Sequence, residues 1–297
     1  MTPPGIPRPA GDAGALLAWG DAARRDLPWR RTRDPWPVLV SELMLQQTQV
    51  ARVVPRYEAF LVDYPTAAAC AAAPLADVIG RWRGLGYNRR AVNLHRCAAT
   101  VTEQHGGRFP DTLEGLRALP GVGPYTARAV LAFAFERDVG VVDTNVGRVL
   151  ARWQGRPLRP AEAQALADAV VPEGRGWAWN QAMFDLGATV CTKRAPRCER
   201  CPVRDGCAWG SAGGPEPDPA VGSAGVGGGQ SRFAGSDRQG RGRLVDALRA
   251  HQRLTPAELA ARAGWPDDPD RARRVAETLV ADGLAGWHAD GTLRLPT

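Results

Sequence analysis

The chain has 297 residues, of which 44% are hydrophobic and 23% are charged. These values are ordinary for globular proteins, so they exclude a fully disordered or fibrous chain, and the length favours two domains. The longest apolar runs, such as residues 127–135, are too short to cross a bilayer, and the first dozen residues lack the features of a signal peptide. We therefore expect a cytoplasmic protein with reduced thiols and no membrane span.

The net charge of +7 is unevenly distributed. Residues 1–208 hold 27 Lys and Arg against 20 Asp and Glu, whereas residues 241–297 have a net charge of only +1. This excess fits a polyanionic partner, although an Arg-rich composition explains it equally well. Every basic residue except Lys193 is an arginine, which limits the amine chemistry available to the protein.

Apolar residues at helical spacing, punctuated by Pro and Gly, predict an all-helical region from about residue 10 to 188. Glu42 lies within one such apolar stretch, residues 38–50. It is either a solvent-facing residue of an ordinary helix or a carboxyl group held in an apolar environment. Its apolar neighbours favour the second interpretation over the first.

A tight helical connection is predicted at Leu119–Gly123, between a helix that ends near Ala118 and one that begins near Pro124. The two glycines allow main-chain N–H groups to approach an anion, which the N-terminus of the second helix also attracts. The segment is therefore a candidate phosphate site, although glycine and proline are normal in any helix connection.

Asp143 precedes a helical run that continues to Trp153. Taken alone, an aspartate at this place is best interpreted as the N-cap of the helix. The surrounding motifs, considered together below, favour a second role for it.

Four cysteines occur within 17 residues, with the pattern C-x6-C-x2-C-x5-C. Reduced thiols so close together indicate a metal centre. The uneven spacing suits an iron–sulfur cluster better than zinc, although spacing alone leaves both open. Cys70 and Cys97 stand apart in apolar stretches and are expected in the core. The clustered cysteines are Cys191, Cys198, Cys201 and Cys207.

Residues 210–240 are rich in Gly, Pro and Ser and predict a flexible linker. The tail that follows is expected to form three helices and a hairpin, which are typical of a winged helix. Winged helices often bind DNA through the third helix, but the low net charge of this tail favours a protein contact. The expected helices and hairpin strands cover residues 243–250, 257–263, 271–281, 284–288 and 292–295.

In this order, the motifs closely resemble the MutY-type adenine DNA glycosylases, which are helix-hairpin-helix enzymes with an iron–sulfur cluster. The resemblance implies a mainly α fold with a two-lobed core, a cluster loop (191–207) and a small winged-helix-like domain. The implied domains are the core over 1–209, the linker over 210–240 and the C-terminal domain over 241–297. The core lobes would be a six-helix barrel (36–136) and a cluster lobe (140–209 with the N-terminal helix). The matching segments are Leu27–Arg30, Ser41–Val50, Gly84–Tyr87, Leu119–Thr126, Asp143–Val146 and the four cysteines.

The resemblance also implies catalytic roles. Glu42 matches the general acid that protonates adenine at N7, so it has to stay protonated near neutral pH, which burial favours. Asp143 matches the carboxylate that stabilises positive charge at C1′ of the sugar. Asn145 and Tyr125 would orient Asp143 and the attacking water, and Arg30 matches a further active-site position.

DNA contacts and the cofactor are implied in the same way. Gln47 and Tyr87 match side chains that enter the base stack once the adenine is flipped out, and Thr48 and Leu85 match positions near the opposite base. The four cysteines would hold a [4Fe-4S] cluster. The backbone amides that would meet a DNA phosphate belong to Gly121, Val122 and Gly123.

The implied function is excision of adenine opposite 8-oxoguanine or guanine in double-stranded DNA, by a monomer associated with the nucleoid. Endonuclease III-type lyases have a lysine where this chain has Tyr125, so a monofunctional glycosylase is favoured. Two alternatives are an endonuclease III-like lyase for oxidised pyrimidines and a non-catalytic DNA-binding regulator. The chain departs from the family pattern because its tail is not the NUDIX-like module that reads 8-oxoguanine.

Overall fold

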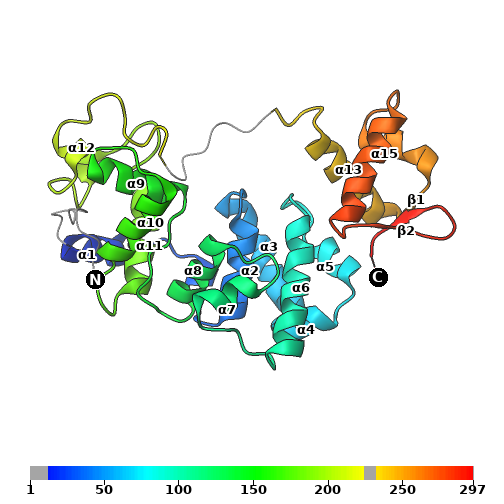
Figure 1. The fold of residues 1–297 in the computed structure, drawn as a ribbon, viewed down its shortest axis with the longest axis horizontal. Coiled ribbons are helices and arrows are strands. Elements are labelled where there is room, and N and C mark those ends of the chain that lie inside the picture. The colour runs from blue at the N-terminus through cyan, green and yellow to red at the C-terminus, as the bar shows by residue number, and fades with distance from the viewer. Residues whose placement is uncertain (1–12, 224–231, 297) are drawn as a thin grey trace. The chain divides into compact units, whose positions relative to one another are not determined.

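The computed structural model describes residues 13–223 and 232–296 (Figure 1). The first twelve residues and part of the predicted linker, 224–231, lie outside the described residues. The chain divides into two compact units, and helix α2 (Pro35–Leu45) passes from one to the other. Unit 1 comprises Met1–Val38, Asp111–Leu113 and Gly123–Gly229, and unit 2 comprises Leu39–Pro110, Glu114–Val122 and Gln230–Thr297.

Unit 1 is built around helix α11, against which α1, α8 and α9 pack. The packing is close because small residues meet: a Cβ added to Gly20 of α1 would lie 2.5 Å from the Cβ of Ala182. The described elements of the unit are α1 (Ala13–Ala23), η1 (Pro28–Arg30), α8 (Pro124–Phe133), α9 (Thr144–Gln154), α10 (Pro160–Val170), α11 (Gly176–Thr189), η2 (Cys198–Arg200) and α12 (Ala208–Ser211).

Helix α8 belongs to unit 1, whereas the sequence placed it in the barrel lobe over 36–136. Its last residue, Phe133, packs edge-on against Phe184 of α11 at 5.5 Å between ring centroids. Arg128 also forms an ion pair with Asp168 at 2.6 Å. These contacts join segments far apart in the chain, so the boundary of the lobe could not be predicted from local sequence.

The segment predicted to begin a flexible linker at residue 210 is folded onto unit 1 as far as residue 223. Asp218 forms an ion pair with buried Arg152 at 2.6 Å, and the indole N–H of Trp209 donates to the carbonyl of Pro215 at 2.7 Å. The Ser223 hydroxyl accepts from the backbone N–H of Leu158 at 3.1 Å. Hydrogen bonds and an ion pair, rather than a hydrophobic core, attach this segment to unit 1. Its low content of large apolar residues therefore wrongly indicated a flexible linker.

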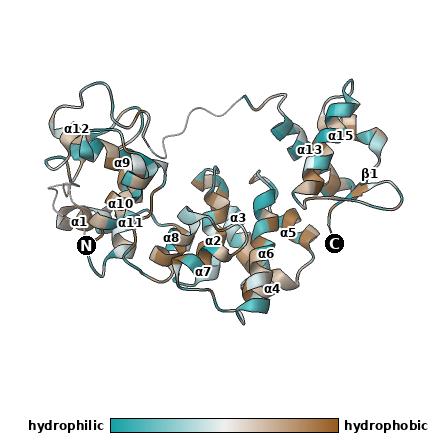
Figure 2. Ribbon diagram, viewed as in Figure 1, coloured by the Kyte–Doolittle hydropathy of each residue, from teal (hydrophilic) through white to brown (hydrophobic). Residues whose placement is uncertain are grey.

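In the helical part of unit 2, α4 and α5 pack against α6. Figure 2 shows the apolar character of α2, whose residues from Val38 to Met44 are buried. Cys70 and Cys97 are fully buried, which confirms them as core residues. Burial raises the pKa of each thiol to about 12. The remaining helices are α3 (Val50–Asp63), α4 (Ala67–Ala72), α5 (Leu75–Arg81), α6 (Arg89–Gln104) and α7 (Leu113–Ala118).

The C-terminal domain, within unit 2, has the winged-helix-like arrangement that the sequence predicts. Its three strands pair antiparallel in the order β1-β3-β2. The sequence missed β1, which has only two residues and therefore no detectable alternation. The elements are α13 (Asp237–His251), β1 (Arg253–Leu254), η3 (Pro256–Glu258), α14 (Leu259–Ala263), α15 (Pro269–Ala281), β2 (Gly286–Trp287) and β3 (Leu293–Arg294). None of the helices in the described ranges has the length and apolar character of a membrane span.

Candidate active site and DNA-contact elements

Asp143 caps helix α9, and its carboxylate is held from two sides. Oδ1 accepts from the backbone N–H groups of Asn145 at 2.9 Å and Val146 at 2.7 Å, and Oδ2 accepts from the Asn145 side-chain amide at 2.9 Å. Burial raises the pKa of Asp143, while these hydrogen bonds and the positive charge of Arg148 act in the opposite direction. The predicted N-cap is present, and the same bonds fix the orientation of a partly buried carboxylate.

Arg148 holds Asn145 in place. Its Nη2 donates to the Asn145 Oδ1 at 2.9 Å and to the Gly187 carbonyl at 2.6 Å, and its Nε donates to the Cys191 carbonyl at 2.8 Å. The guanidinium therefore connects the residue that orients Asp143 to the first cysteine of the cluster loop. This role could not be predicted from the sequence, because the contacts with Gly187 and Cys191 join segments that are distant in the chain.

The position of Asn145 also depends on a glycine. A Cβ added to Gly187 of α11 would lie 2.7 Å from the Cβ of Asn145 and 3.2 Å from its backbone carbonyl carbon. Real Cβ atoms do not approach that closely, so α11 can contact the start of α9 only because residue 187 has no side chain.

The four clustered cysteines all line one cavity of unit 1. None of the cysteines in the chain forms a disulfide. Two donors point at the sulfur atoms: Arg152 Nη1 lies 3.3 Å from the Cys191 Sγ, and the Gly210 N–H lies 3.2 Å from the Cys207 Sγ. Such donors stabilise thiolates, so the cavity suits a group bound through sulfur.

Across the residues the structure describes, no three His, Cys, Asp or Glu side chains are placed to hold one metal ion. The four thiols that line the cavity are ligands suited to zinc or to an iron–sulfur cluster. The preference for a cluster therefore continues to depend on the C-x6-C-x2-C-x5-C spacing.

The loop around the cysteines has an exposed basic face. Arg152, which is 1% exposed, fixes this loop from inside by donating to the carbonyls of Thr192 at 2.8 Å and Lys193 at 3.3 Å. The loop can therefore present its outer cations to phosphates. Its exposed basic residues are Lys193, Arg194, Arg197, Arg200 and Arg204.

Arg30 is placed differently from the sequence expectation. Its guanidinium forms a two-pronged ion pair with Asp185 of α11, at 2.7 and 2.9 Å, and both side chains are buried. It also donates to the Arg25 carbonyl at 3.1 Å. Because its donors are used inside the fold, Arg30 serves to attach η1 to α11 and is a positioning residue. The sequence missed its partner, Asp185.

In unit 2, Glu42 lies on α2 and is 5% exposed, which excludes the solvent-facing alternative. Ser41, Leu43 and Met44 beside it are also buried. The carboxyl group of Glu42 is therefore held inside the helical part of unit 2, out of bulk solvent.

Gln47 and Tyr87 share an unusual backbone geometry. Their φ angles are 55° and 45°, in the left-handed region that non-glycine residues seldom occupy. Tyr87 follows Gly84 and Gly86, whose φ angles are also positive. Both side chains are exposed. Strain of this kind is found at functional sites, which agrees with the predicted role of both residues in the base stack.

Arg90 joins the two strained loops. Its Nη1 donates to the carbonyls of Leu43, Met44 and Gln46, and its Nη2 donates to those of Leu85 and Gly86, at distances from 2.6 to 3.0 Å. Burial lowers the pKa of Arg90 to about 10. One guanidinium thus binds both the end of α2 and the 84–87 loop. The sequence analysis did not predict this role of Arg90.

Thr48 and Leu85 differ in what they can contribute. The Thr48 hydroxyl donates to the Leu85 carbonyl at 3.2 Å, so it links the same two loops. The Leu85 side chain is 3% exposed. Leu85 therefore packs in the core and shapes the loop, and the expectation that it contacts DNA through its side chain is not supported.

The predicted hairpin is present between α7 and α8. Gly121 has φ 76°, and a Cβ there would lie 2.5 Å from the Asn93 Cβ, so only glycine fits. Val122 is buried, whereas Gly121 and Gly123 are exposed. Gly123 is the N-cap of α8 and provides no side chain to cover the first turn, so an anion can approach the backbone there.

Tyr125 is the second residue of α8, immediately after the hairpin, and is partly buried. Lys193, the one lysine of the sequence, is exposed on the cysteine loop of unit 1. No lysine is therefore available at the start of α8.

The chain is similar to known DNA repair proteins. Residues 40–172 match the model of the HhH-GPD superfamily of base excision DNA repair proteins. An adenine DNA glycosylase of Mycolicibacterium smegmatis is 44% identical over 94% of both chains. The human adenine DNA glycosylase is also 44% identical, but over 65% of this chain and 38% of its own length.

A solved structure supports the fold. The structure of a thermostable thymine-DNA glycosylase matches with a TM-score of 0.62 and 31% identity, over 67% of this chain and 95% of the other. The mycolicibacterial relative is matched over 94% of this chain, so that match extends into the C-terminal domain.

Gly187→Ala should destabilise the protein, because its Cβ would overlap Asn145. Overpacking of this kind lowers the free energy of unfolding by about 1–3 kcal/mol. The control is Gly80→Ala in α5, where nothing lies within 4 Å of the added Cβ, and the change should stabilise by up to about 1 kcal/mol. Urea unfolding measures both, and equal effects would refute the close approach.

Arg90→Met should lower the free energy of unfolding by about 3–5 kcal/mol, because it leaves buried carbonyls without donors. DNA affinity should fall as well, since both strained loops lose their support. Arg90→Lys should recover only part of either quantity, because an ammonium cannot reach two loops at once. Arg83→Met, an exposed neighbour, is the control for urea unfolding and DNA binding. If Arg90→Met had the free energy of unfolding and the DNA affinity of the wild type, Arg90 would not be the residue that supports the two loops.

Proposed function

Because the chain belongs to the adenine DNA glycosylase family, we propose that it releases adenine from duplex DNA in which the adenine faces 8-oxoguanine or guanine. The reaction is hydrolysis of the glycosidic bond as a step of base excision repair. The observation that carries the proposal is the Asp143 carboxylate, fixed by Asn145 and the start of α9. The protein would act as a monomer on DNA in the nucleoid.

The chemistry divides between two carboxyl groups. Glu42, buried and protonated, donates its proton to N7 of an adenine that has left the base stack. The bond between C1′ and N9 then breaks, and its electron pair stays with the base, which departs neutral. Ionised Asp143 stabilises the positive charge on the sugar until water adds to C1′ and loses a proton.

Other residues position these groups. Asn145 holds the Asp143 carboxylate, and Tyr125, at the start of α8, would help to orient the water. Arg30 contributes indirectly by keeping η1 on α11.

The DNA contacts follow from the exposed elements. Gln47 and Tyr87 would fill the stack beside the flipped adenine, with Thr48 supporting their loops. The backbone of Gly121, Val122 and Gly123 would bind a phosphate at the start of α8. Support comes from the exposure of both glycines and of both strained side chains.

We also propose that the four cysteines hold a [4Fe-4S] cluster. Supporting this are the shared cavity, the donors from Arg152 and Gly210, and the spacing of the four cysteines. When bound, the cluster would supply four metal–thiolate bonds to the loop. The chain's own part is to present the exposed arginines of that loop to the DNA backbone.

A lyase activity is disfavoured by the residue at the start of α8. A Schiff base with the sugar requires an amine, and this position is Tyr125. The product should therefore be an intact strand with an abasic site, which breaks only after alkali. A non-catalytic regulator would need neither carboxyl group.

Glu42→Gln and Asp143→Asn should each reduce adenine release by at least about 100-fold, since one removes the acid and the other the anion. The measurement is single-turnover excision from duplexes with adenine opposite 8-oxoguanine, guanine, cytosine or thymine, with alkali to reveal abasic sites. Glu103→Gln, an exposed carboxyl group of α6, should leave release unchanged. Release at the wild-type rate by both carboxyl variants would exclude the proposal, and nicking without alkali would favour the lyase.

Arg148→Gln should shift the acid limb of the pH–rate profile to higher pH. Asp143 has to be ionised, so activity is lost as pH falls through its pKa. Arg148 lowers that pKa, and its removal raises it, so the variant loses activity at a higher pH. Arg148→Lys, which keeps the charge, should retain more of the acid limb. A profile that only decreases in height would show a purely structural role.

A further inference from the structure

Helix α13 of the C-terminal domain is attached to the loop that carries Tyr87. The Arg249 guanidinium donates to the Ile79 carbonyl at 2.6 Å through Nη2 and at 3.2 Å through Nε, and to Asn88 Oδ1 at 3.1 Å. Its side chain is only 9% exposed. Ile79 lies in the last turn of α5, where a cation is favoured, and its carbonyl also accepts from the backbone N–H of Trp82 at 3.2 Å.

A second set of contacts holds the other side of the domain. Asp282, just after α15, forms an ion pair with Arg89 of α6 at 3.1 Å and another with Arg241 of α13. Gly283 comes close to α6: a Cβ there would lie 3.5 Å from Val92 Cγ1. The contacts of Arg249 and of Asp282 together fix the C-terminal domain against residues 84–90.

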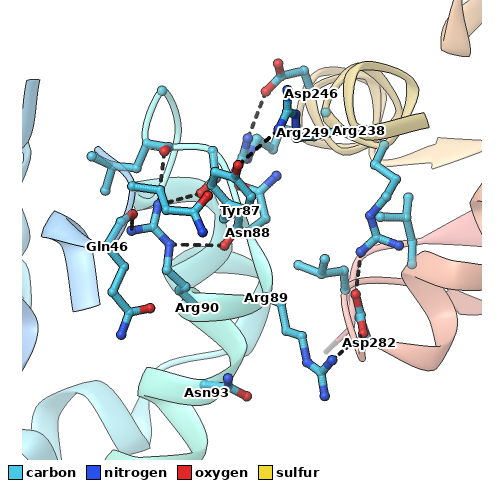
Figure 3. Close-up of a pocket in the computed structure, with 18 of the residues that line it drawn as sticks. Gln46, Tyr87, Asn88, Arg89, Arg90, Asn93, Arg238, Asp246, Arg249 and Asp282 are labelled. Carbon is cyan, nitrogen blue, oxygen red and sulfur yellow. Dashed lines mark hydrogen bonds and ion pairs between the residues drawn. The ribbon is translucent and has the colours of Figure 1, made fainter. Parts of the chain in front are cut away.

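These contacts enclose a groove of about 820 Å³ within unit 2 (Figure 3). One side consists of residues already assigned to DNA contact, including Gln47 and Tyr87. The other side comes from the C-terminal domain and includes Phe233, Arg238 and Arg241. The groove therefore continues the DNA-contact surface onto a domain that has no assigned role.

The side chains of the groove suit a nucleotide. Phe233 is 54% exposed and Tyr87 is 39% exposed, which is unusual for aromatic residues. Arg238 lies between them, with Nη1 3.2 Å from the Tyr87 hydroxyl and its guanidinium 5.2 Å from the Phe233 ring. Arg52, also exposed, lines the same groove. Aromatic faces beside arginines bind an unstacked base and its phosphate without strict sequence preference.

The groove is a better candidate than the exposed face of α15, the helix through which many winged helices read DNA. That face mixes Arg273 and Arg274 with Asp270 and Glu277, so its charges balance. In the groove, by contrast, arginines outnumber the acidic residues Asp246 and Asp282.

We propose that this groove binds a nucleotide of the DNA strand opposite the excised adenine, and that Phe233 and Arg238 are the contacts supplied by the C-terminal domain. The opposite strand is favoured because Leu85 and Tyr87, which line the groove, are among the positions expected near the opposite base. The inference rests on the proposed adenine excision. It gives the C-terminal domain the function of an opposite-strand reader, with Arg249 as the residue that positions it.

The test measures affinity for a duplex with a stable abasic analogue opposite 8-oxoguanine, guanine or thymine. The variant Phe233→Ala with Arg238→Ala should bind the 8-oxoguanine duplex about 10-fold or more weakly, because stacking contributes about 1–3 kcal/mol per base. Arg249→Met should give a comparable loss, since the domain is no longer held. Arg262→Ala, an exposed arginine of α14 outside the groove, is the charge-matched control.

A photocrosslink locates the strand. 5-Iodouracil at or beside the position opposite the abasic analogue should crosslink to the peptide that contains Phe233, and the same probe in the other strand should not. Crosslinks only from the adenine strand, affinities equal to those of Arg262→Ala, or tighter binding by the groove variant would overturn the inference. Failure of the wild-type protein to release adenine from any duplex would instead overturn the proposed function.

Discussion

The part of unit 2 proposed to face DNA depends on one buried guanidinium, that of Arg90. Helix α2 ends beside Gln47, and the 84–87 loop turns beside Tyr87, and at both places carbonyl groups lack helical partners. Arg90 satisfies both sets with the two ends of one planar group. A charge taken out of water at this cost is retained only where many acceptors surround it. The two strained residues are therefore held at a fixed spacing by this guanidinium, with the Thr48 hydroxyl as a second link between the loops.

Buried arginines also bind backbone and side-chain acceptors in unit 1, so the high arginine content does not by itself indicate a surface that binds DNA. Arg148 connects Asn145 to the cysteine loop, Arg152 binds the loop from inside, and Arg30 is paired with Asp185. These guanidinium groups work within the fold. The net positive charge therefore overstates the surface offered to DNA. Cations that do stay exposed include those on the cysteine loop and, along the groove, Arg52.

Asp143 shows that a structural and a chemical role need not compete. The backbone bonds that make it an N-cap also fix the carboxylate and oppose the effect of burial on its pKa. A carboxylate that stabilises a cation has to be ionised and immobile. The helix N-terminus holds the Asp143 carboxylate in one orientation and opposes the rise in its pKa that burial causes. The N-cap interpretation and the catalytic interpretation thus describe one geometry.

The sequence by itself determined the local features: the cap at Asp143, the glycine hairpin before α8, the cysteine spacing, the missing lysine and the elements of the C-terminal domain. Each depends on residues close together in the chain, where spacing and backbone preference act directly. Only the tertiary structure decided the roles of Arg90 and Asp185, the burial of Leu85, the folding of residues 212–223 and the groove beside Phe233. Those depend on contacts between distant segments, which leave no period or motif in the sequence.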